Sequence, residues 1–367
     1  MTRVLVVDDS PLMRRLLGDI LRGAEGFEVT FARNGLEALE ALHAAPPPDV
    51  ITLDVQMPEM DGLACLDRIM LERPTPVVMI SALTADGAAE TLEALSLGAI
   101  DVITKPSGAV SLELETLGPQ IVETLRNAAG ARLRRTHRLT DRVRSLTRAA
   151  GRPEPAPSTR PQASEPIRTV QGTESELPGV VLVGCSTGGP PALDALLAPL
   201  PADFPLPIVV AQHMPRTFTG ALARRLDGLC ALTVCEVDRP TLLAPGHVYI
   251  ARGDGDLILS ARPGGIHLVP APASAAFRWH PSVERLVESA LGALPPDRLI
   301  GVLMTGMGND GAVAMARLHE TGGFTMAEAE ETAVVWGMPG DLVRRGGASL
   351  VSPLDDLAQQ LLARVAA

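Results

Sequence analysis

Short apolar runs alternate with segments of helical periodicity in two separate stretches of the 367 residues, and this alternation limits the fold more than any other feature. In residues 1–125 the predicted strand segments are RVLVVDD, FEVTFA, DVITLD, PVVMIS and AIDVITKP. Residues 179–367 repeat the pattern with VVLV, PIVVAQH, ALTVCEV, RLIGVLMTG, GFTMAE and SLVS. Strands that alternate with helices pair in parallel, with helices on both faces of the sheet. We therefore predict an α/β fold of two doubly wound parallel-sheet domains, the first flavodoxin-like and the second Rossmann-like.

One segment of the second domain departs from this alternation. HVYIARGDGDLILSARPGGIHLVP is rich in strand formers and is interrupted by Gly and Pro turns. Consecutive strands with short turns favour antiparallel pairing. We expect a small β-hairpin insert here.

Residues 126–178 differ in character from both domains. ARLRRTHRLTDRVRSLTRAAGR is rich in arginine, and RPEPAPSTRPQASEP is rich in Pro, Ser and Ala. Such a segment cannot bury a core, so we predict a linker. The arginines suit a solvated extension of the preceding helix or an acidic surface. Because no helix-turn-helix pattern follows and the net charge is −11, we expect no nucleic-acid partner.

Composition also bears on where the protein works. No apolar run reaches the length of a membrane span, and the start of the chain has no signal-peptide pattern. The four cysteines have neither metal-ligand spacing nor the density of a disulfide framework. The expectation is a cytoplasmic protein that is not inserted in a membrane.

Polar residues follow the predicted strands of the first domain. Asp8 and Asp9 follow the first strand and Asp54 follows the third, whereas Ser81 ends the fourth strand and Lys105 ends the fifth. The carboxyl ends of parallel strands share one edge of the sheet, so these side chains should converge. Carboxylates gathered there would hold a hard cation such as Mg²⁺, and the lysine would balance a phosphoryl group. Any one of them alone would be an ordinary loop residue.

The segments VVDDSPLMRRLL, LDVQMPEMDGL, MISALT and GAIDVITKP resemble the receiver domain of two-component response regulators. The resemblance implies phosphorylation at Asp54 by a histidine kinase, and Mg²⁺ bound by Asp9, Asp54 and Gln56. It assigns supporting roles to Asp8, Ser81 and Lys105 and implies a cis bond between Lys105 and Pro106. Many receivers carry an aromatic switch residue where this chain has Val102, which argues against an aromatic readout.

The turn Gly184-Cys185-Ser186-Thr187-Gly188-Gly189 lies between a buried strand and a helical run. A serine on such a turn is exposed above the sheet edge, and the start of the helix supplies N–H groups for an oxyanion. The turn could instead only cap the helix, or it could cradle a phosphate. The phosphate reading lacks both the Gly-Lys-Ser/Thr ending and the GxGxxG spacing.

Two further residues at strand ends make Ser186 a candidate nucleophile. His213 ends PIVVAQH, and Asp310 follows LMTGMGN at the start of a predicted helix. A serine hydroxyl needs an imidazole to take its proton and a carboxylate to orient that imidazole. Separately, His213 could be a core histidine and Asp310 a helix cap with Asn309 as competitor. Cys185 is interpreted as a packing residue.

The motifs GCSTGGP, QHMP, APGHVYIA, HPSVE, LMTGMGNDG and VVWGMP resemble the CheB-type protein-glutamate methylesterase domain. The resemblance implies Ser186 as nucleophile, His213 as base and Asp310 as orienting carboxylate, with the backbone at Thr187 and Met307 as oxyanion site. It implies hydrolysis of glutamate γ-methyl esters on chemoreceptors, with release of methanol, and deamidation of receptor glutamines. It also implies an esterase step without a cofactor, activated through the receiver.

Some positions depart from the family pattern, namely His280 and Glu284 in HPSVE and Glu328 after the GFTMA strand. Two rival functions stay open at this point. The first is the same esterase acting on a methylated protein outside chemotaxis. The second is a phosphate sink or docking module that does not use the serine. The sequence does not identify the receptor, the kinase or the oligomeric state.

Overall fold

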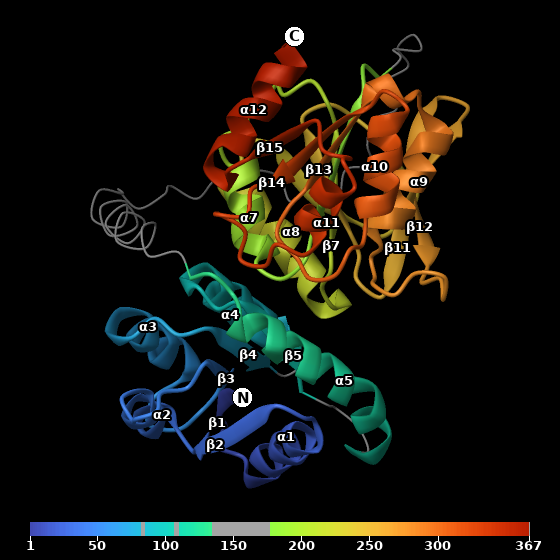
Figure 1. Ribbon diagram of the computed structural model, residues 1–367. Coiled ribbons are helices and arrows are strands. Elements are labelled where there is room, and N and C mark those ends of the chain that lie inside the picture. The colour runs from blue at the N-terminus through green and yellow to red at the C-terminus, as the bar shows by residue number, and fades with distance from the viewer. Residues whose placement is uncertain (82–84, 106–109, 134–176, 367) are drawn as a thin grey trace, which may run out of the picture. The chain divides into compact units, whose positions relative to one another are not determined.

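The computed structural model describes residues 1–81, 85–105, 110–133 and 177–366 (Figure 1). Most of the expected linker, and the expected cis bond at Pro106, lie outside the described residues. Of the helices in the described part, none is long and apolar enough to cross a membrane.

The first domain contains a parallel sheet with the strand order β2-β1-β3-β4-β5. Its strands are β1 (Thr2–Val7), β2 (Phe27–Ala32), β3 (Val50–Asp54), β4 (Val77–Ser81) and β5 (Asp101–Thr104). Its helices are α1 (Pro11–Gly23), α2 (Gly35–Leu42), α3 (Gly62–Glu72), α4 (Ala85–Leu97) and α5 (Val110–Ala129). The predicted flavodoxin-like order of this domain is therefore confirmed.

The sequence at each turn explains why these helices begin where they do. Ser10, Asn34 and Asp61 precede α1, α2 and α3, and each side chain accepts a hydrogen bond from a backbone N–H in the first turn. These caps satisfy donors that the helix itself cannot pair. The strands bury both faces: Val4 and Val6 pack with α1 and α5, whereas Leu5 and Val7 pack with α2, α3 and α4.

The second domain contains a seven-stranded parallel sheet with the order β15-β14-β13-β6-β7-β10-β8. Its strands are β6 (Val180–Cys185), β7 (Ile208–Gln212), β8 (Thr233–Val237), β10 (His247–Ala251), β13 (Leu299–Leu303), β14 (Phe324–Glu328) and β15 (Leu350–Ser352). Its helices are α7 (Gly189–Leu197), α8 (Arg216–Leu229), α9 (Val283–Ala293), α10 (Ala312–Glu320), α11 (Met338–Arg344) and α12 (Leu354–Ala366), besides a short 3₁₀ turn at Pro296–Arg298. The serine strand β6 lies near the centre of this sheet.

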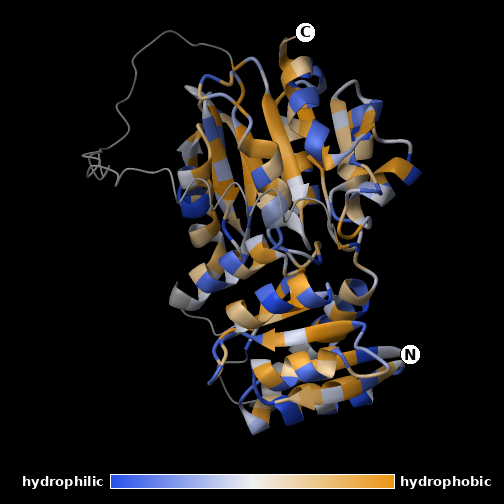
Figure 2. Ribbon diagram, turned by 90° about the vertical axis from the view of Figure 1, so that its left-hand side faces the viewer, coloured by the Kyte–Doolittle hydropathy of each residue, from blue (hydrophilic) through white to orange (hydrophobic). Residues whose placement is uncertain are grey.

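Two apolar layers enclose this second sheet. Val181 and Val183 of β6 pack with α7, α8 and α12, whereas Val180 and Leu182 pack with α9, α10 and α11. Figure 2 shows hydrophobic residues concentrated on the strands. Strands buried on both faces read as continuous apolar runs, which is why they could be found in the sequence.

A small antiparallel sheet completes the domain. It has the order β11-β12-β9, with β11 (Gly255–Arg262), β12 (Gly265–Pro272) and β9 (Thr241–Leu242). The predicted hairpin is thus present, but the prediction that HVYIA belongs to it is wrong. This strand, β10, pairs in parallel with β7 and β8. Val248, Tyr249 and Ile250 are all buried, as expected for a strand covered on both faces.

Candidate active site and receiver site

The half-buried Ser186 directly follows β6, at the carboxyl edge of the second sheet. Helix α7 begins two residues after Thr187, and its N-cap is Gly188, with a positive φ of 77°. Among the described residues, no side chain accepts a capping hydrogen bond at the start of this helix. The alternative in which Ser186 or Thr187 serves only as a helix cap therefore has no support from the structure.

His213 lies beside Ser186 because of strand register. Strands β6 and β7 are neighbours, and Cys185 pairs with Gln212. Ser186 directly follows Cys185, and His213 directly follows Gln212, so the two residues lie side by side at the sheet edge. The buried Gln212 fastens the two together: its Nε2 donates to Ser186 O at 2.9 Å and to His213 O at 3.0 Å. The backbone positions of Ser186 and His213 are thereby fixed relative to each other.

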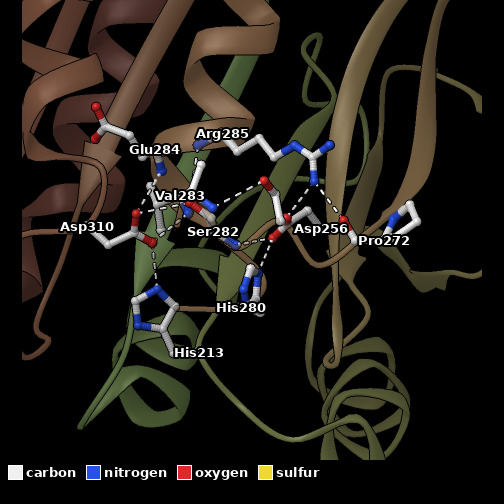
Figure 3. Close-up of polar contacts among 11 residues, drawn as sticks. His213, Asp256, Pro272, His280, Ser282, Val283, Glu284, Arg285 and Asp310 are labelled. Atoms are coloured by element: carbon white, nitrogen blue, oxygen red, sulfur yellow. Dashed lines mark hydrogen bonds and ion pairs between the residues drawn. The ribbon is translucent and has the colours of Figure 1, made fainter. Parts of the chain in front are cut away.

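Asp310 meets His213 from the other side of β6. It follows β13, and its Oδ2 lies 2.8 Å from His213 Nε2. Asp310 is only 6% exposed and does not cap α10, whose N-cap is Gly311. Its carboxylate instead accepts hydrogen bonds at the start of α9, from Ser282 Oγ and from the backbone N–H groups of Val283 and Glu284 (Figure 3). An aspartate bound in this way has a fixed orientation toward the imidazole.

The second ring nitrogen of His213 is distinctive. Nδ1 is buried and has no partner among the described residues, whereas Nε2 is bound to Asp310. The imidazole lies parallel to the Trp279 ring, with 6.0 Å between ring centroids and an interplanar angle of 4°. Among the contacts of the described residues, no hydrogen bond links the Ser186 hydroxyl to His213. Catalytic hydrogen bonds often tighten only when substrate is bound.

Two loops at this edge are fastened to each other. Ser186 N donates to Thr305 O at 2.9 Å, and Thr305 Oγ1 donates to Thr187 O at 2.9 Å. In the described part of the chain, the backbone N–H groups of Thr187 and Met307 have no acceptor. Unpaired N–H groups next to a serine can bind a developing oxyanion.

Gly306 is required for this close approach. A Cβ added at Gly306 would lie 2.8 Å from Ser186 Cβ and 2.3 Å from Met338 Sδ. Gly308 has a positive φ of 72°, and a Cβ there would lie 2.6 Å from the Trp279 ring. The glycines of TGMG therefore let the loop contact both Ser186 and Trp279.

Several residues at this site were not found by sequence reasoning, namely Gln212, Trp279, Ser282 and Thr305. Gln212 left the clearest signal, since a polar residue that ends an apolar strand next to His213 is seldom incidental. Ser282 occurs 28 residues before Asp310 and carried no local signal for contact with it.

The departures from the family pattern also lie at this edge. Glu328 is fully buried at the end of β14, where it accepts from Thr305 N at 2.8 Å and from Thr332 Oγ1 at 3.0 Å. It therefore holds the loop that carries Met307. His280 binds Asp256, with Nδ1 and Oδ1 separated by 2.8 Å.

The acidic cluster of the first domain forms at the carboxyl edge of its sheet. The carboxylates of Asp8, Asp9 and Asp54 can place one oxygen each within 4.8 Å of one another. Lys105 Nζ lies 2.7 Å from Asp54 Oδ2 and 3.1 Å from Asp8 Oδ2, although only the shorter contact has hydrogen-bond geometry. Hard oxygen ligands at this spacing suit a divalent cation.

Burial and neighbouring charges shift the pKa values of Asp54 and Lys105 in this cluster. Burial raises the pKa of Asp54, and the Asp8 charge adds to the effect, while the Lys105 hydrogen bond opposes it. Burial alone would lower the pKa of Lys105, but the hydrogen bond and charge of Asp54, with the charge of Asp8, outweigh it and raise that pKa. A second cation in the site would relieve the remaining repulsion between the carboxylates.

The other predicted receiver residues line the same cavity of about 580 Å³, which includes Asp9, Asp54, Gln56, Ser81 and Lys105. Gln56 N donates to Asp54 Oδ1 at 3.4 Å. Ser81 is buried and donates to Gly87 O at 3.3 Å. Asp8 is buried next to Asp9 and Asp54.

These features together define a class of protein: a receiver-type domain joined in one chain to an α/β domain with a hydrolase-type site. Comparison with known proteins narrows that class. The model of the CheB methylesterase family matches residues 181–361, and that of the response regulator receiver domain matches residues 4–115.

Full-length relatives share the whole arrangement. The chain is 56% identical over 363 residues to a protein-glutamate methylesterase/protein-glutamine glutaminase of Rhodopseudomonas palustris, covering 99% of this chain and 98% of that one. It is 53% identical to a protein of the same name from Rhodospirillum rubrum, covering 98% and 95%. The crystal structure of the Thermotoga maritima CheB methylesterase catalytic domain is 38% identical and covers 51% of this chain and 98% of that one, with a TM-score of 0.49. The chain belongs to the CheB methylesterase family of response regulators.

Proposed function

We propose that this methylesterase hydrolyses glutamate γ-methyl esters on chemoreceptors, deamidates receptor glutamines, and is activated by phosphorylation at Asp54. The observation that carries the proposal is the state of His213. Its Nε2 is bound to Asp310, and its buried Nδ1 has no partner among residues 1–81, 85–105, 110–133 and 177–366. Gln212 also links its backbone to that of Ser186. This leaves one imidazole nitrogen free for the serine hydroxyl.

In the proposed acylation step, His213 Nδ1 takes the hydroxyl proton while Ser186 Oγ bonds to the ester carbonyl carbon. Asp310 stabilises the resulting imidazolium, and the N–H groups of Thr187 and Met307 stabilise the tetrahedral oxyanion. The imidazolium then gives its proton to the methoxy oxygen as the C–O bond breaks. Methanol leaves, and an acyl ester remains on Ser186.

Deacylation reverses these roles. His213 takes a proton from water, the hydroxide attacks the acyl carbon, and the proton returns to Ser186 Oγ as the ester bond breaks. The released glutamate carries a carboxylate. With a glutamine substrate the same steps release ammonia in place of methanol. His213 accepts and returns the proton in each step of the scheme, and the backbone N–H groups only stabilise the oxyanion.

The receiver site fits a magnesium ion, because the Asp8, Asp9 and Asp54 carboxylates can each place one oxygen within 4.8 Å of the others. In our proposal Asp9, Asp54 and the backbone of Gln56 would hold the ion, with Asp8 supporting them. Bound there, the ion would neutralise charge on the transferred phosphoryl group. Lys105, already 2.7 Å from Asp54, would pair with the phosphorylated side chain.

We also propose the domain division and the partners. Residues 1–125 would form the receiver, residues 126–178 the linker and residues 179–367 the esterase. The phosphodonor would be a histidine kinase, and the substrates would be methyl-accepting chemoreceptors. We place this activity in the cytoplasm; all four cysteines are free thiols, which suits a reducing compartment.

Methanol release from methylated receptor membranes tests the proposal. Wild type would be compared with Ser186→Ala and Asp54→Asn, each with and without a small phosphodonor and Mg²⁺. Ser186→Ala should lose about 10⁴-fold or more of the rate. Asp54→Asn should keep the basal rate and lose only the stimulation. Folded, phosphorylated wild type that releases no methanol from any receptor preparation would exclude the proposed substrate.

A further inference from the structure

A second buried carboxylate lies on the opposite side of the α9 start from Asp310. Asp256 is the second residue of β11, and its side chain is fully buried. Its Oδ1 accepts from Ser282 N at 2.8 Å and lies 2.8 Å from His280 Nδ1. Its Oδ2 accepts from Arg285 at 2.7 Å. Asp256 therefore binds the start of α9 at three points.

The same segment of chain holds Asp310 with its other side. Ser282 is the N-cap of α9, and its Oγ donates to Asp310 Oδ1 at 3.1 Å. Val283 N donates to Oδ2 at 2.7 Å, and Glu284 N donates to Oδ1 at 3.1 Å. Figure 3 shows Asp310 and His213 on one side of this segment and Asp256 on the other. Ser282 is thus bonded to one carboxylate through its backbone and to the other through its hydroxyl.

Charge favours this arrangement. Burial alone would raise the pKa of Asp256, but hydrogen bonds from His280, Ser282 and Arg285 outweigh it and hold that pKa below its usual range. Asp256 is therefore an anion fixed by a guanidinium and an imidazole. The N-terminus of α9 carries a partial positive charge that also favours both carboxylates.

We propose that Asp256 is a positioning residue for the esterase, acting through Ser282 and the start of α9 on Asp310. By fixing Ser282, Asp256 keeps the three donors aimed at Asp310, and Asp310 in turn keeps His213 bound through Nε2. This inference rests on the function proposed above. Asp256 would not contact the ester itself.

The test uses the full-length protein and variants that alter the Asp256 contacts to different degrees. Asp256→Asn keeps the shape and removes the charge. Arg285→Met removes one ion pair from a side chain that is 25% exposed, and Arg285→Lys restores its charge. Asp194→Asn is the matched control, because Asp194 pairs with Arg225 at 2.8 and 2.5 Å between α7 and α8, away from Asp310.

Two quantities would be measured for each folded variant. The first is kcat and KM for methyl-ester hydrolysis. The second is the proton resonance of the His213 Nε2–H group that bonds to Asp310, assigned by its loss in His213→Gln. Asp256→Asn should lower kcat about ten- to a hundredfold with little change in KM, because a displaced general base loses rate at constant binding. Its Nε2–H resonance should shift or broaden.

Arg285→Met should lower kcat and shift the Nε2–H resonance less than Asp256→Asn does. Arg285→Lys should restore part of both. Asp194→Asn should leave kcat and the resonance unchanged. An Asp256→Asn variant with wild-type kcat and an unshifted resonance would overturn the positioning role. Should Asp256→Asn fail to fold, the two Arg285 variants carry the same decision. If wild type proves inactive on methyl esters, the resonance still tests the positioning role separately from the proposed function.

Discussion

At the residue scale, the orientation of His213 differs from that in serine protease triads. There the carboxylate binds Nδ1 and the serine faces Nε2. Here Nε2 is bound to Asp310, and Nδ1 has no hydrogen-bond partner in the part of the chain that the structure describes. Gln212 holds the two residues in this geometry. Its side chain is only 2% exposed and donates to both Ser186 O and His213 O.

Gln212→Leu should therefore reduce both stability and rate. The change leaves Ser186 O and His213 O without their donor, which should cost about 1–3 kcal/mol of unfolding free energy. The rate of ester hydrolysis should fall at the same time, because the two backbones lose their common anchor. Thr325→Val is the control, since Thr325 is equally buried and donates to Gly347 O at 2.5 Å at the amino end of β14. It should lose stability and keep its kcat, and a Gln212→Leu variant that keeps full kcat would contradict the anchor role.

A second residue-scale prediction concerns Glu284, for which burial, with a smaller contribution from the Asp310 charge, raises the pKa from 4.5 to about 7. Between these two pH values Glu284 holds a proton in the folded chain that it has lost in the unfolded chain, so the contribution of Glu284 to stability should fall as pH rises from 4.5 to 7. Glu284→Gln should remove that part of the pH dependence. Urea unfolding at several pH values measures it, and identical pH slopes for the two proteins would refute the assignment.

At the element scale, the loop after β13, residues 305–308, is in close contact with the turn that carries Ser186. Ser186 N bonds to Thr305 O, and Gly306 lies directly against Ser186. Glu328 at the end of β14 and Asp256 on β11 hold this loop and the start of α9 in place. The site thus depends on contacts among elements that are distant in the sequence.

Gly306→Ala should lower kcat/KM by at least about tenfold and destabilise the protein by about 1–3 kcal/mol, because the new methyl group would displace Ser186. Gly228→Ala in α8 is the matched control, since nothing lies within 4 Å of the added Cβ. That change should be neutral or stabilising by up to about 1 kcal/mol. Rates and thermal unfolding of both variants check the prediction. A Gly306→Ala enzyme with wild-type activity would show that the loop has room to move.

At the scale of the whole molecule, two chemistries are held on two separate sheets. The acidic cluster follows the strands of the first sheet, and Ser186, His213 and Asp310 follow strands of the second. A divalent cation would therefore bind on the receiver sheet, apart from Ser186, His213 and Asp310 on the second sheet.

Removing divalent cations with a chelator should abolish phosphodonor stimulation and leave the basal rate of methanol release unchanged. The reason is that the carboxylates suited to Mg²⁺ belong to the receiver sheet, whereas His213 has the Asp310 carboxylate as its partner. The measurement is the initial rate before and after chelation, with Mg²⁺ added back as control. Loss of the basal rate on chelation would place a metal in the esterase step itself.

Features that depend on local sequence could be predicted, whereas contacts between residues distant in the sequence could not. The strands and the residues that end them were predictable, because parallel strands buried on both faces are continuous apolar runs. The parallel pairing of β10 was not, since nothing local tells HVYIA which strands it will meet. The contacts of Asp256 with Ser282 and of Ser282 with Asp310 span 26 and 28 residues and depend on tertiary folding alone.

The neighbour of the serine has a consequence for life under oxidative stress. Cys185 is fully buried, burial raises the pKa of its thiol, and the thiol donates to Gln212 at 3.0 Å. Peroxide reacts with exposed thiolates, and Cys185 is neither exposed nor ionised. Peroxide should therefore leave the Cys185 thiol reduced, and its hydrogen bond to Gln212 beside Ser186 should persist.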